Sequence, residues 1–529
     1  MGKTKKTAPP SPASPDAGPP GTEAGAAGKT APAWRAGLDF VLTLGGAVLI
    51  ALAVKAYAFD VYLIPSGSME TSLHGRPDGG DRIFCSKLHY RFRPLRRWEV
   101  AVFEFPYEKA RLSENPEAIE QYRGQNFVKR VVGLPGESLA ISRGDVWIRP
   151  LEAGTDFRRL AKPDPVQRDM WQNVYDEDFS DLAGAELEYS WKIFGEAISL
   201  ERGGALRLSP EPGPVGLDYR PLVPSRAGKP ELEELPGIPD RYTLEQPVQF
   251  KCRRPIAGGG TCGRLFVKTV KTQSMLARCP ECAFLNDEIS AIFYHRRSGL
   301  YRHPAAAGPP QGEDAAPRRA DYHLVPDLRA VVDLVLERRD SVFSITMHGD
   351  AGRIRASFAG DGRVEIGLAG RPARPEARTL ADLEPGRSHR LEFYLADGVA
   401  RIFVDSEREC ALEIPAGGGD RFQPRQLPKR SGVSLAAEGG GVEIRRIRLD
   451  RDIFYYSGWE RPGGERFSGM SSLGEVLVDA NSFFPMGDHC PSSFDARSWG
   501  PPPLSLLRGP ALLVWWPPER FHRIAGPPG

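Results

Sequence analysis

The stretch FVKRVVGLPGESLAI, from Phe127 to Ile141, decides how this chain folds. Its first six residues combine Phe and Val with two charged side chains, a composition that favours a β-strand. The GLPGE segment at 133–137 is typical of a turn, because Pro fixes one φ angle and Gly can adopt a positive one. The stretch therefore predicts two strands joined by a turn.

Lys129 lies inside the first of these strands. Successive side chains of a strand point to opposite faces, so Lys129 shares a face with Phe127 and Val131, whereas Arg130 points to the other face and keeps its charge. An apolar environment disfavours the ammonium form of lysine and lowers its pKa. The pattern makes Lys129 a candidate general base, although most strand lysines are solvated.

The segment IPSGSMETSLHG, residues 64–75, supplies two serines around one glycine. A linker would explain the serines and the glycine but not the flanking Pro65 and Met69. A serine hydroxyl is a weak nucleophile until a base removes its proton. The chain has nine His, and none near these serines indicates a triad, so Lys129 is the base to consider.

Directly before the serines runs the chain's one long apolar segment. We predict a disordered cytoplasmic tail at 1–33 and a transmembrane helix at 34–59, whose apolar part from Gly37 to Phe59 is long enough to cross a bilayer. Basic residues before the helix then place the rest of the chain outside the cytoplasm, anchored to the cell membrane. The alternative is a cleaved secretory signal ending at 56–58, which the long tail and long apolar run disfavour.

Length and composition point to a mainly β protein of several domains. A chain of 529 residues is too long for one compact domain, and its 49 Pro and 57 Gly indicate turn-rich β structure. The net charge of +2 argues against a nucleic-acid partner. We predict that 60–150 and 456–529 form two parts of one antiparallel β catalytic core.

The intervening block, 151–455, reads as an inserted β-sandwich. Short alternating strands follow one another from Ala330 onward, and Asp397-Gly398 marks a hairpin turn. WQNVYDEDF and ALRLSP are candidate first strands of the same sandwich. The block resembles concanavalin-like or laminin-G-like jelly rolls, which bind sugars or proteins, but the residues show no ligand site, so a spacer or docking surface remains an equal alternative.

A cysteine-rich segment at 250–285 lies inside this block. Four thiolates could hold a structural zinc in a ribbon-like site: Cys252, Cys262, Cys279 and Cys282. The last two form a CxxC knuckle, whereas the first two are ten residues apart, which is longer than usual. Two disulfides or free thiols are therefore the alternatives.

Four segments in order resemble the signature boxes of type I signal peptidases: PSGSMETSL, GDRIFCSKLHYRFRPLRRWEVAVFEFP, FVKRVVGLPGE and MGDHCPSSFDARSWG. These enzymes are membrane-bound Ser/Lys endopeptidases that remove signal peptides from exported proteins. The resemblance covers about 38–150 and 470–529 and leaves the middle block uncovered. It implies cleavage after small residues in Ala-x-Ala sites, without a catalytic cofactor. The implied partners are preproteins, the lipid bilayer and the secretion translocon.

The resemblance also implies a role for each matching residue. Ser68 is the nucleophile, and Lys129 is the general base. The oxyanion hole consists of the Ser66 hydroxyl and the Ser68 backbone N–H. The supporting residues are Ser493, which orients the lysine, and the ion pair of Asp495 and Arg497.

The chain departs from the family pattern at several positions. Thr71 stands where Pro is usual and His489 where Asn is usual, Cys490-Pro491 replace polar residues, and RRWEV replaces Arg-Gly-Asp-Val. No departure removes a catalytic atom, but the turn near Asp488 is less certain to keep the family geometry. Two other functions remain to be considered: a Ser/Lys self-cleaving protease, and a membrane-anchored binding protein with an inactive peptidase core.

Overall fold

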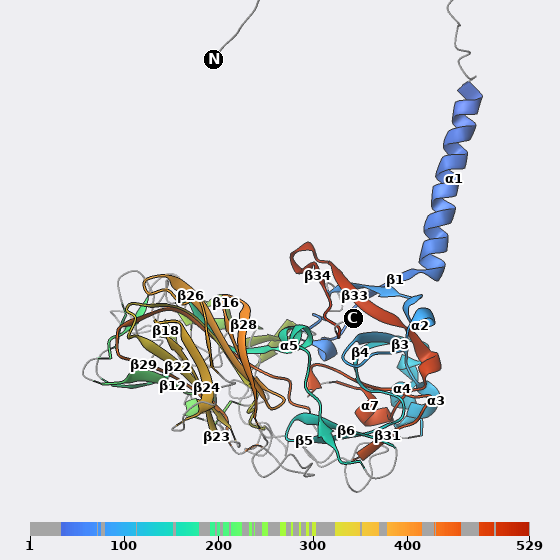
Figure 1. The fold of residues 1–529 in the computed structure, drawn as a ribbon. Helices are drawn as coiled ribbons and strands as arrows, with labels where there is room; N and C mark the ends of the chain where they lie inside the picture. Colours follow the sequence, from blue (N-terminus) through green and yellow to red (C-terminus); the bar gives the residue numbers. More distant parts are fainter. Residues whose placement is uncertain are drawn as a thin grey trace, which may run out of the picture. The chain divides into compact units, whose positions relative to one another are not determined.

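The fold is known from a computed structural model of the chain (Figure 1). It describes residues 33–70, 72–75, 80–112, 114–151, 155–178, 191–195, 198–200, 205–210, 213–224, 232–234, 237–238, 246–251, 265–270, 277–278, 285–286, 292–295, 299–302, 323–349, 352–369, 378–414, 428, 430–455, 475–490 and 493–527. The chain consists of two compact units, residues 1–56 and residues 57–529.

The described part of the first unit is the helix α1, Ala33–Tyr57, whose last residue is the first of the second unit. Its large apolar side chains are exposed: Leu38, Phe40, Val41, Leu42, Leu44, Val48, Leu49 and Leu52. Among the residues that the structure describes, no helix combines the length and apolarity needed to cross a membrane. The membrane-spanning helix at 34–59 stays a prediction from the sequence.

The second unit begins with a sheet that carries Lys129 on β4 and is followed after β1 by the turn that contains the serines. Its strand order is β1-β2-β33-β3-β4-β32, with β34 paired to β33, and all pairs are antiparallel. The bounds are Phe59–Leu63 for β1, Arg82–Ser86 for β2, Val100–Glu104 for β3, Asn126–Gly133 for β4, Phe484–Met486 for β32, Leu507–Trp516 for β33 and His522–Arg523 for β34. Strand β33, from the C-terminal part of the chain, thus lies between β2 and β3, which both come from the N-terminal part (Figure 1).

A smaller sheet follows in the order β31-β5-β6-β7. It consists of Glu475–Val478, Glu137–Ser142, Asp145–Pro150 and Arg158–Arg159. The predicted turn at 133–137 connects β4 to β5, and Gly136 has the positive φ of 80° that the pattern indicates. Short helical turns complete this region: η1 Gly67–Met69, α2 His89–Phe92, α3 Tyr107–Ala110, α4 Pro116–Ile119, η2 Glu120–Tyr122, α5 Asp164–Met170, α7 Ala496–Trp499, η8 Leu504–Leu506 and η9 Pro518–Arg520.

Two larger sheets enclose one apolar core in the middle of the chain. One sheet has the order β10-β11-β30-β21-β26-β27-β28, with β8 paired to β30, and the other has the order β25-β24-β23-β22-β29-β12-β9. Core side chains from both sheets, such as Leu217, Phe343, Phe393 and Ile447, are fully buried. A mainly β fold is therefore confirmed.

The strands of the first large sheet are β8 Gln172–Asp178, β10 Ile198–Leu200, β11 Leu206–Leu208, β21 Leu328–Leu336, β26 Ser388–Ala396, β27 Val399–Val404, β28 Glu407–Glu413 and β30 Val442–Arg451. Those of the second are β9 Trp191–Phe194, β12 Val215–Tyr219, β22 Val342–Gly349, β23 Gly352–Ala359, β24 Arg363–Leu368, β25 Arg378–Leu380 and β29 Gly432–Glu438. The predicted hairpin joins β26 to β27, with φ angles of 49° at Asp397 and 78° at Gly398.

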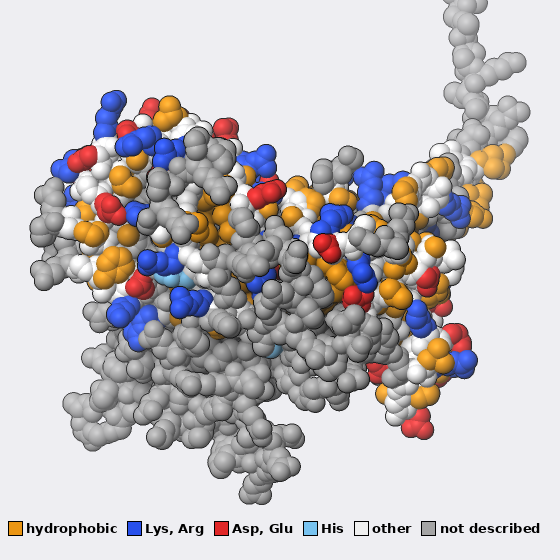
Figure 2. All heavy atoms as spheres, turned by 60° about the horizontal axis from the view of Figure 1, so that its bottom comes forward, with side chains coloured by type: hydrophobic (Ala, Val, Ile, Leu, Met, Phe, Trp, Pro, Cys, Tyr) orange, Lys and Arg blue, Asp and Glu red, His pale blue; other side chains and the backbone are white. Residues whose placement is uncertain are grey.

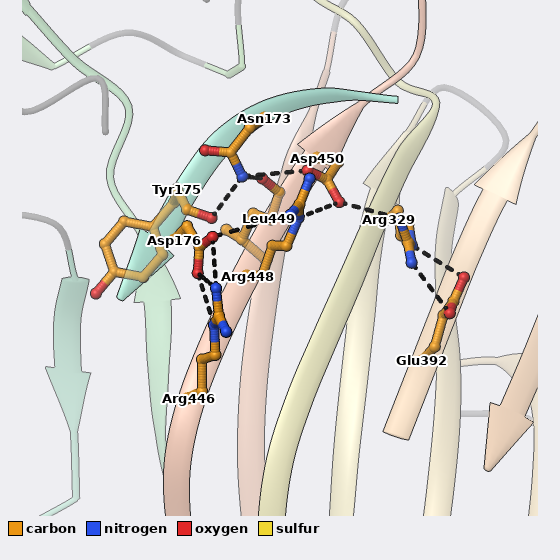
Figure 3. A network of polar contacts seen from close by, with 9 residues as sticks. All are labelled: Asn173, Tyr175, Asp176, Arg329, Glu392, Arg446, Arg448, Leu449 and Asp450. Atoms are coloured by element: carbon orange, nitrogen blue, oxygen red, sulfur yellow. Dashed lines mark hydrogen bonds and ion pairs between the residues drawn. The ribbon is translucent and has the colours of Figure 1, made fainter. Parts of the chain in front are cut away.

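Charged side chains form a network over part of the outer face of the first large sheet, on β8, β30, β21 and β26 (Figure 3). Asp176 pairs with Arg446 at 2.8 Å and lies 3.9 Å from Arg448, while Arg329 pairs with Glu392 at 2.9 Å. Apolar residues on alternate positions of the same strands point into the core, as the twofold period of a strand requires. Figure 2 shows that Lys, Arg, Asp, Glu and apolar side chains are interspersed over the described part of one molecular face.

Smaller sheets lie within the middle block. β13 Leu222–Pro224 pairs with β14 Leu232–Glu234, and β17 Ala277–Arg278 pairs with β18 Leu285–Asn286. Four strands have the order β16-β15-β19-β20, with bounds Leu265–Val270, Gln246–Lys251, Ile292–His295 and Gly299–Arg302. The four cysteines of the predicted zinc site lie outside the described residues, so that site stays a prediction.

Candidate active site

Ser68 lies in η1, the turn that follows β1. The turn is held by local hydrogen bonds, since Glu70 N–H donates to the Gly67 carbonyl at 3.1 Å and Leu73 N–H donates to the Met69 carbonyl at 2.8 Å. Met69 and Leu73 are buried in the apolar cluster beneath it. These contacts fix the backbone on either side of the serine.

Two glycines allow other chain segments to approach this turn. A Cβ atom at Gly75 would lie 1.8 Å from the Ser66 carbonyl oxygen. A Cβ at Gly487 would lie 2.5 Å from the Ser68 carbonyl oxygen and 2.1 Å from the Ser493 hydroxyl. All three distances are far below contact distance, so only glycine fits at either position without a shift of the neighbouring atoms.

Lys129 lies in β4 opposite Ala101 of β3, and its amine is 2.5 Å from the Ser68 hydroxyl oxygen. The lysine is only 5% exposed. Burial lowers its pKa to about 8, and the nearby Asp495 and Asp488 carboxylates oppose this effect only in part. At pH 7 about a tenth of the amine is then uncharged, far more than for a solvated lysine, and this neutral form can accept a proton from the hydroxyl.

Ser66 precedes the turn in an extended conformation. Its hydroxyl oxygen lies 3.4 Å from the Ser68 hydroxyl oxygen. The two serines therefore share one side of the turn, with the Lys129 amine in contact with the second. In this arrangement the Ser66 hydroxyl donates to the Ser68 hydroxyl oxygen, and its predicted part in an oxyanion hole stays a prediction.

The predicted supporting residues come from the C-terminal part of the chain. Asp495 caps α7 and pairs with the buried Arg497 guanidinium at 2.7 Å, and it also accepts from Gly487 N–H at 2.9 Å. Burial by itself would raise the Asp495 pKa, but Arg497 and these hydrogen bonds hold it below its usual value. Ser493 is buried near Asp495; among the described residues its hydroxyl makes no hydrogen bond of standard geometry, including to Lys129.

A second buried ion pair lies beside the lysine and was not assigned a role from the sequence. Arg130 donates to Asp488 at 2.7 Å and to the Trp98 carbonyl at 2.8 Å, and both charged side chains are fully buried. Ser72 lies 2.6 Å from Asp488 and 3.0 Å from Arg130. The sequence did contain a signal for this pair, namely Arg130 as a second charged residue in an otherwise apolar strand. If that side chain is buried, its guanidinium needs a carboxylate partner.

His489 contacts the serine turn through its backbone, since its N–H donates to the Ser68 carbonyl at 3.1 Å. Any residue other than proline could make this contact. The departure from Asn at this position therefore leaves the hydrogen bond to the serine turn in place.

Residues 37–185 match the family described as signal peptidase, peptidase S26. This range contains both serines of the turn and Lys129. This part of the chain is therefore similar to signal peptidases of the S26 family. The resemblance to type I signal peptidases is thus confirmed for the catalytic region, whereas 456–529, which supplies Asp495 and Arg497, lies beyond the matched range.

The same region is also similar to curated proteins. Signal peptidase I of Leptolyngbya laminosa is 35% identical over 117 residues, which is 22% of this chain and 52% of that protein. The probable signal peptidase I-2 of Synechocystis sp. is 30% identical over 120 residues, or 23% of this chain and 49% of that protein. The chain thus spans about half the length of these curated relatives.

Among solved structures, galectin LEC-6 from Caenorhabditis elegans is 19% identical, covers 24% of this chain and 83% of the galectin, and has a TM-score of 0.19. A score this low assigns no fold beyond the sheets already described. The concanavalin-like or laminin-G-like nature of the middle block stays a prediction.

Proposed function

We propose that this protein is a membrane-anchored serine endopeptidase of the signal peptidase I type, which cleaves signal peptides from exported preproteins. The observation that supports it most directly is the 2.5 Å contact between the buried Lys129 amine and the Ser68 hydroxyl. A lysine with a lowered pKa beside a serine is the arrangement that activates a hydroxyl without histidine. The S26 match covers both residues.

The proposed reaction has two stages. Ser68 Oγ attacks the scissile carbonyl carbon while Lys129 takes the hydroxyl proton, and the oxyanion accepts hydrogen bonds from the Ser66 hydroxyl and the Ser68 N–H. Lys129 then gives the proton to the leaving amine as the C–N bond breaks, which leaves an acyl ester on Ser68. Water then attacks the ester carbonyl and gives a proton to Lys129, and Lys129 passes that proton to Ser68 Oγ as the ester C–O bond breaks, which releases the carboxyl product and regenerates the serine.

We further propose that the site works at the membrane surface. A signal peptide is an apolar segment, and Ser68 follows the apolar run that ends at Phe59 by only nine residues. Alternate residues of β1, Phe59, Val61 and Leu63, expose large apolar side chains on one face of that strand. The substrate would then be presented to the serine by the bilayer, and the secretion translocon would deliver it.

The proposal is tested by giving the purified full chain, in detergent, a preprotein with an Ala-x-Ala site. We expect a single cut after the second Ala, identified by N-terminal sequencing of the product. A matched preprotein with Leu at both Ala positions should remain intact, because shallow subsites reject larger side chains. Absence of any cut in the first substrate would favour the binding protein with an inactive core; cleavage of the protease's own chain instead would favour the self-cleaving protease.

The pH dependence of cleavage provides a separate check. Lys129 must be neutral to accept the serine proton, and its pKa is lowered to about 8. We therefore expect kcat/KM to rise with pH, to reach half its maximum near pH 8 and to fall about tenfold for each pH unit below that midpoint. A profile that is flat through this range, measured on the Ala-x-Ala preprotein, would show that another group accepts the proton.

A further inference from the structure

The short helix α5, Asp164–Met170, lies between the catalytic core and the large sandwich sheet and contacts both. Val166 and Met170, four residues apart on one face, are fully buried in the apolar cluster of the catalytic core. Asp164, Arg168 and the following Trp171 have the spacing of another face and contact residues of the sandwich, as described below. The helix therefore has one face for each part.

The sandwich-facing side of α5 makes specific polar contacts. Asp164 accepts from the Tyr394 hydroxyl at 2.6 Å and pairs with Arg401 at 3.2 Å and Arg408 at 3.4 Å. These three partners come from β26, β27 and β28. A single carboxylate thus ties the start of α5 to three neighbouring strands of the sandwich.

Aromatic contacts add to this attachment. The Trp171 ring packs edge-on against Tyr394 with centroids 5.4 Å apart, and Arg168 lies 5.2 Å above the Phe403 ring. Trp171, Tyr394 and Phe403 form a separate buried apolar cluster on the outer face of the sheet. The outer face of the sandwich is therefore covered by α5 at this point.

A buried lysine fastens the segment just before α5. The Lys162 amine lies 2.7 Å from Asp397 and 2.8 Å from Asp452, and all three side chains are at most 5% exposed. The Lys162 backbone N–H also donates to Asp397 at 2.8 Å. A buried amine between two carboxylates holds its position strongly, because separating these charges would leave them uncompensated away from water.

The other end of α5 reaches the serine turn. The Asp169 carbonyl lies 3.2 Å from the Ser72 hydroxyl, and the Asp169 carboxylate accepts from Ala525 N–H at 2.8 Å. Ser72 follows the nucleophile by four residues and also contacts Asp488, the partner of Arg130 beside Lys129. Hydrogen bonds through Ser72 thus connect Asp169 to the segment that follows the nucleophile and to the Arg130–Asp488 pair beside Lys129.

We propose that α5 couples the inserted sandwich to the Ser68 turn, with Asp164 as the positioning residue on the sandwich side. The sandwich is then a part of the catalytic unit rather than a separate appendage, and a change in its contacts with α5 alters the rate of the chemical step. The effect on catalysis rests on the proposed peptidase function, whereas the mechanical coupling does not.

The test compares two Ala substitutions in the full chain. Asp164→Ala removes the contacts with Tyr394, Arg401 and Arg408. Asp176→Ala is the matched control, because it removes ion pairs with Arg446 and Arg448 on the same sheet face (Figure 3). The Asp176 side chain is 7% exposed and that of Asp164 25%, so the control is the more disruptive change if only stability matters.

We expect Asp164→Ala to lower kcat by about tenfold or more with KM nearly unchanged, because small displacements of a reacting group reduce rate strongly. Asp176→Ala should leave kcat unchanged even if it lowers Tm. Asp164→Asn, which keeps an oxygen that can accept from Tyr394, should restore part of the rate. Equal effects of the two Ala variants on kcat, or no effect of Asp164→Ala, would overturn the coupling.

Hydrogen exchange separates a failure of the coupling from a failure of the proposed function. The amides of Glu70 and Leu73, whose hydrogen bonds hold the serine turn, should exchange about tenfold faster in Asp164→Ala and at the original rate in Asp176→Ala. That result in a protein that cleaves no preprotein would sustain the coupling and reject the peptidase. If instead the unmodified chain cleaves the preprotein and the Glu70 and Leu73 amides exchange at the same rate in both variants, the peptidase function is supported and the coupling is rejected.

Discussion

Replacing Ser68 with Ala is expected to lower the rate of preprotein cleavage by roughly 10⁴ to 10⁶, because the acyl ester can no longer form. The Ser68 hydroxyl is the group in contact with the Lys129 amine at 2.5 Å. Any remaining rate would come from substrate binding and the oxyanion donors alone. The measurement is the initial rate of product release from the Ala-x-Ala preprotein, followed by mass spectrometry.

Ser86→Ala is the matched control for this substitution. Ser86 is another buried serine of the same sheet, in β2, and contacts neither Ser68 nor Lys129 in any recorded hydrogen bond among the described residues. The Ser86→Ala variant should cleave the preprotein at the rate of the unmodified chain. Full activity of Ser68→Ala would exclude Ser68 as the nucleophile, while the absence of cleavage in all three proteins would point to the binding function.

Replacing Lys129 with Met is expected to lower kcat by about 10⁴ or more, because serine and its base act as a unit and losing either disables both. Met has a similar length and no amine. Because Lys129 is 5% exposed and packs in an apolar region, the substitution should leave Tm near its original value or raise it. A steep loss of kcat with Tm retained would identify a chemical role rather than a structural one.

Lys129→Arg distinguishes proton transfer from the effect of a positive charge. Guanidinium stays protonated at all working pH values, so it supplies charge but no base. We expect this variant to be as inactive as Lys129→Met, and neither variant should retain the rise in kcat/KM near pH 8. Appreciable cleavage by Lys129→Arg would show that the proton goes to a different acceptor.

Local features of the chain were predictable in detail. Phe127–Val132 lies in a strand and the turn at 133–137 follows it, since alternation and turn residues act over only a few positions. The Asp397-Gly398 hairpin formed for the same reason. The predicted first strands of the sandwich were also confirmed, because β8 and β11 both pair with β30.

The surroundings of the site were less predictable. The family boxes named Ser66, Ser68, Lys129, Asp495 and Arg497, but not the partners that bury them. The Arg130–Asp488 pair joins residues 358 positions apart, and the Ser72–Asp169 contact spans 97. Neither contact can be predicted from neighbouring residues. The sequence shows that a strand contains a charged residue, but it does not show whether water or a distant carboxylate is its partner.

The sequence by itself determined that this chain is mainly β, where its strands and turns fall, and that its serine and lysine boxes resemble those of signal peptidases. These properties follow from side-chain periodicity, turn chemistry and residue identity, which need no knowledge of distant contacts. Only the tertiary structure decided that Lys129 is buried 2.5 Å from Ser68 with a pKa of about 8, and that α5 links the serine turn to the sandwich. These properties depend on distant groups, Asp488, Asp495 and Arg497 near Lys129 and Asp169 of α5 at the serine turn, which only folding brings together.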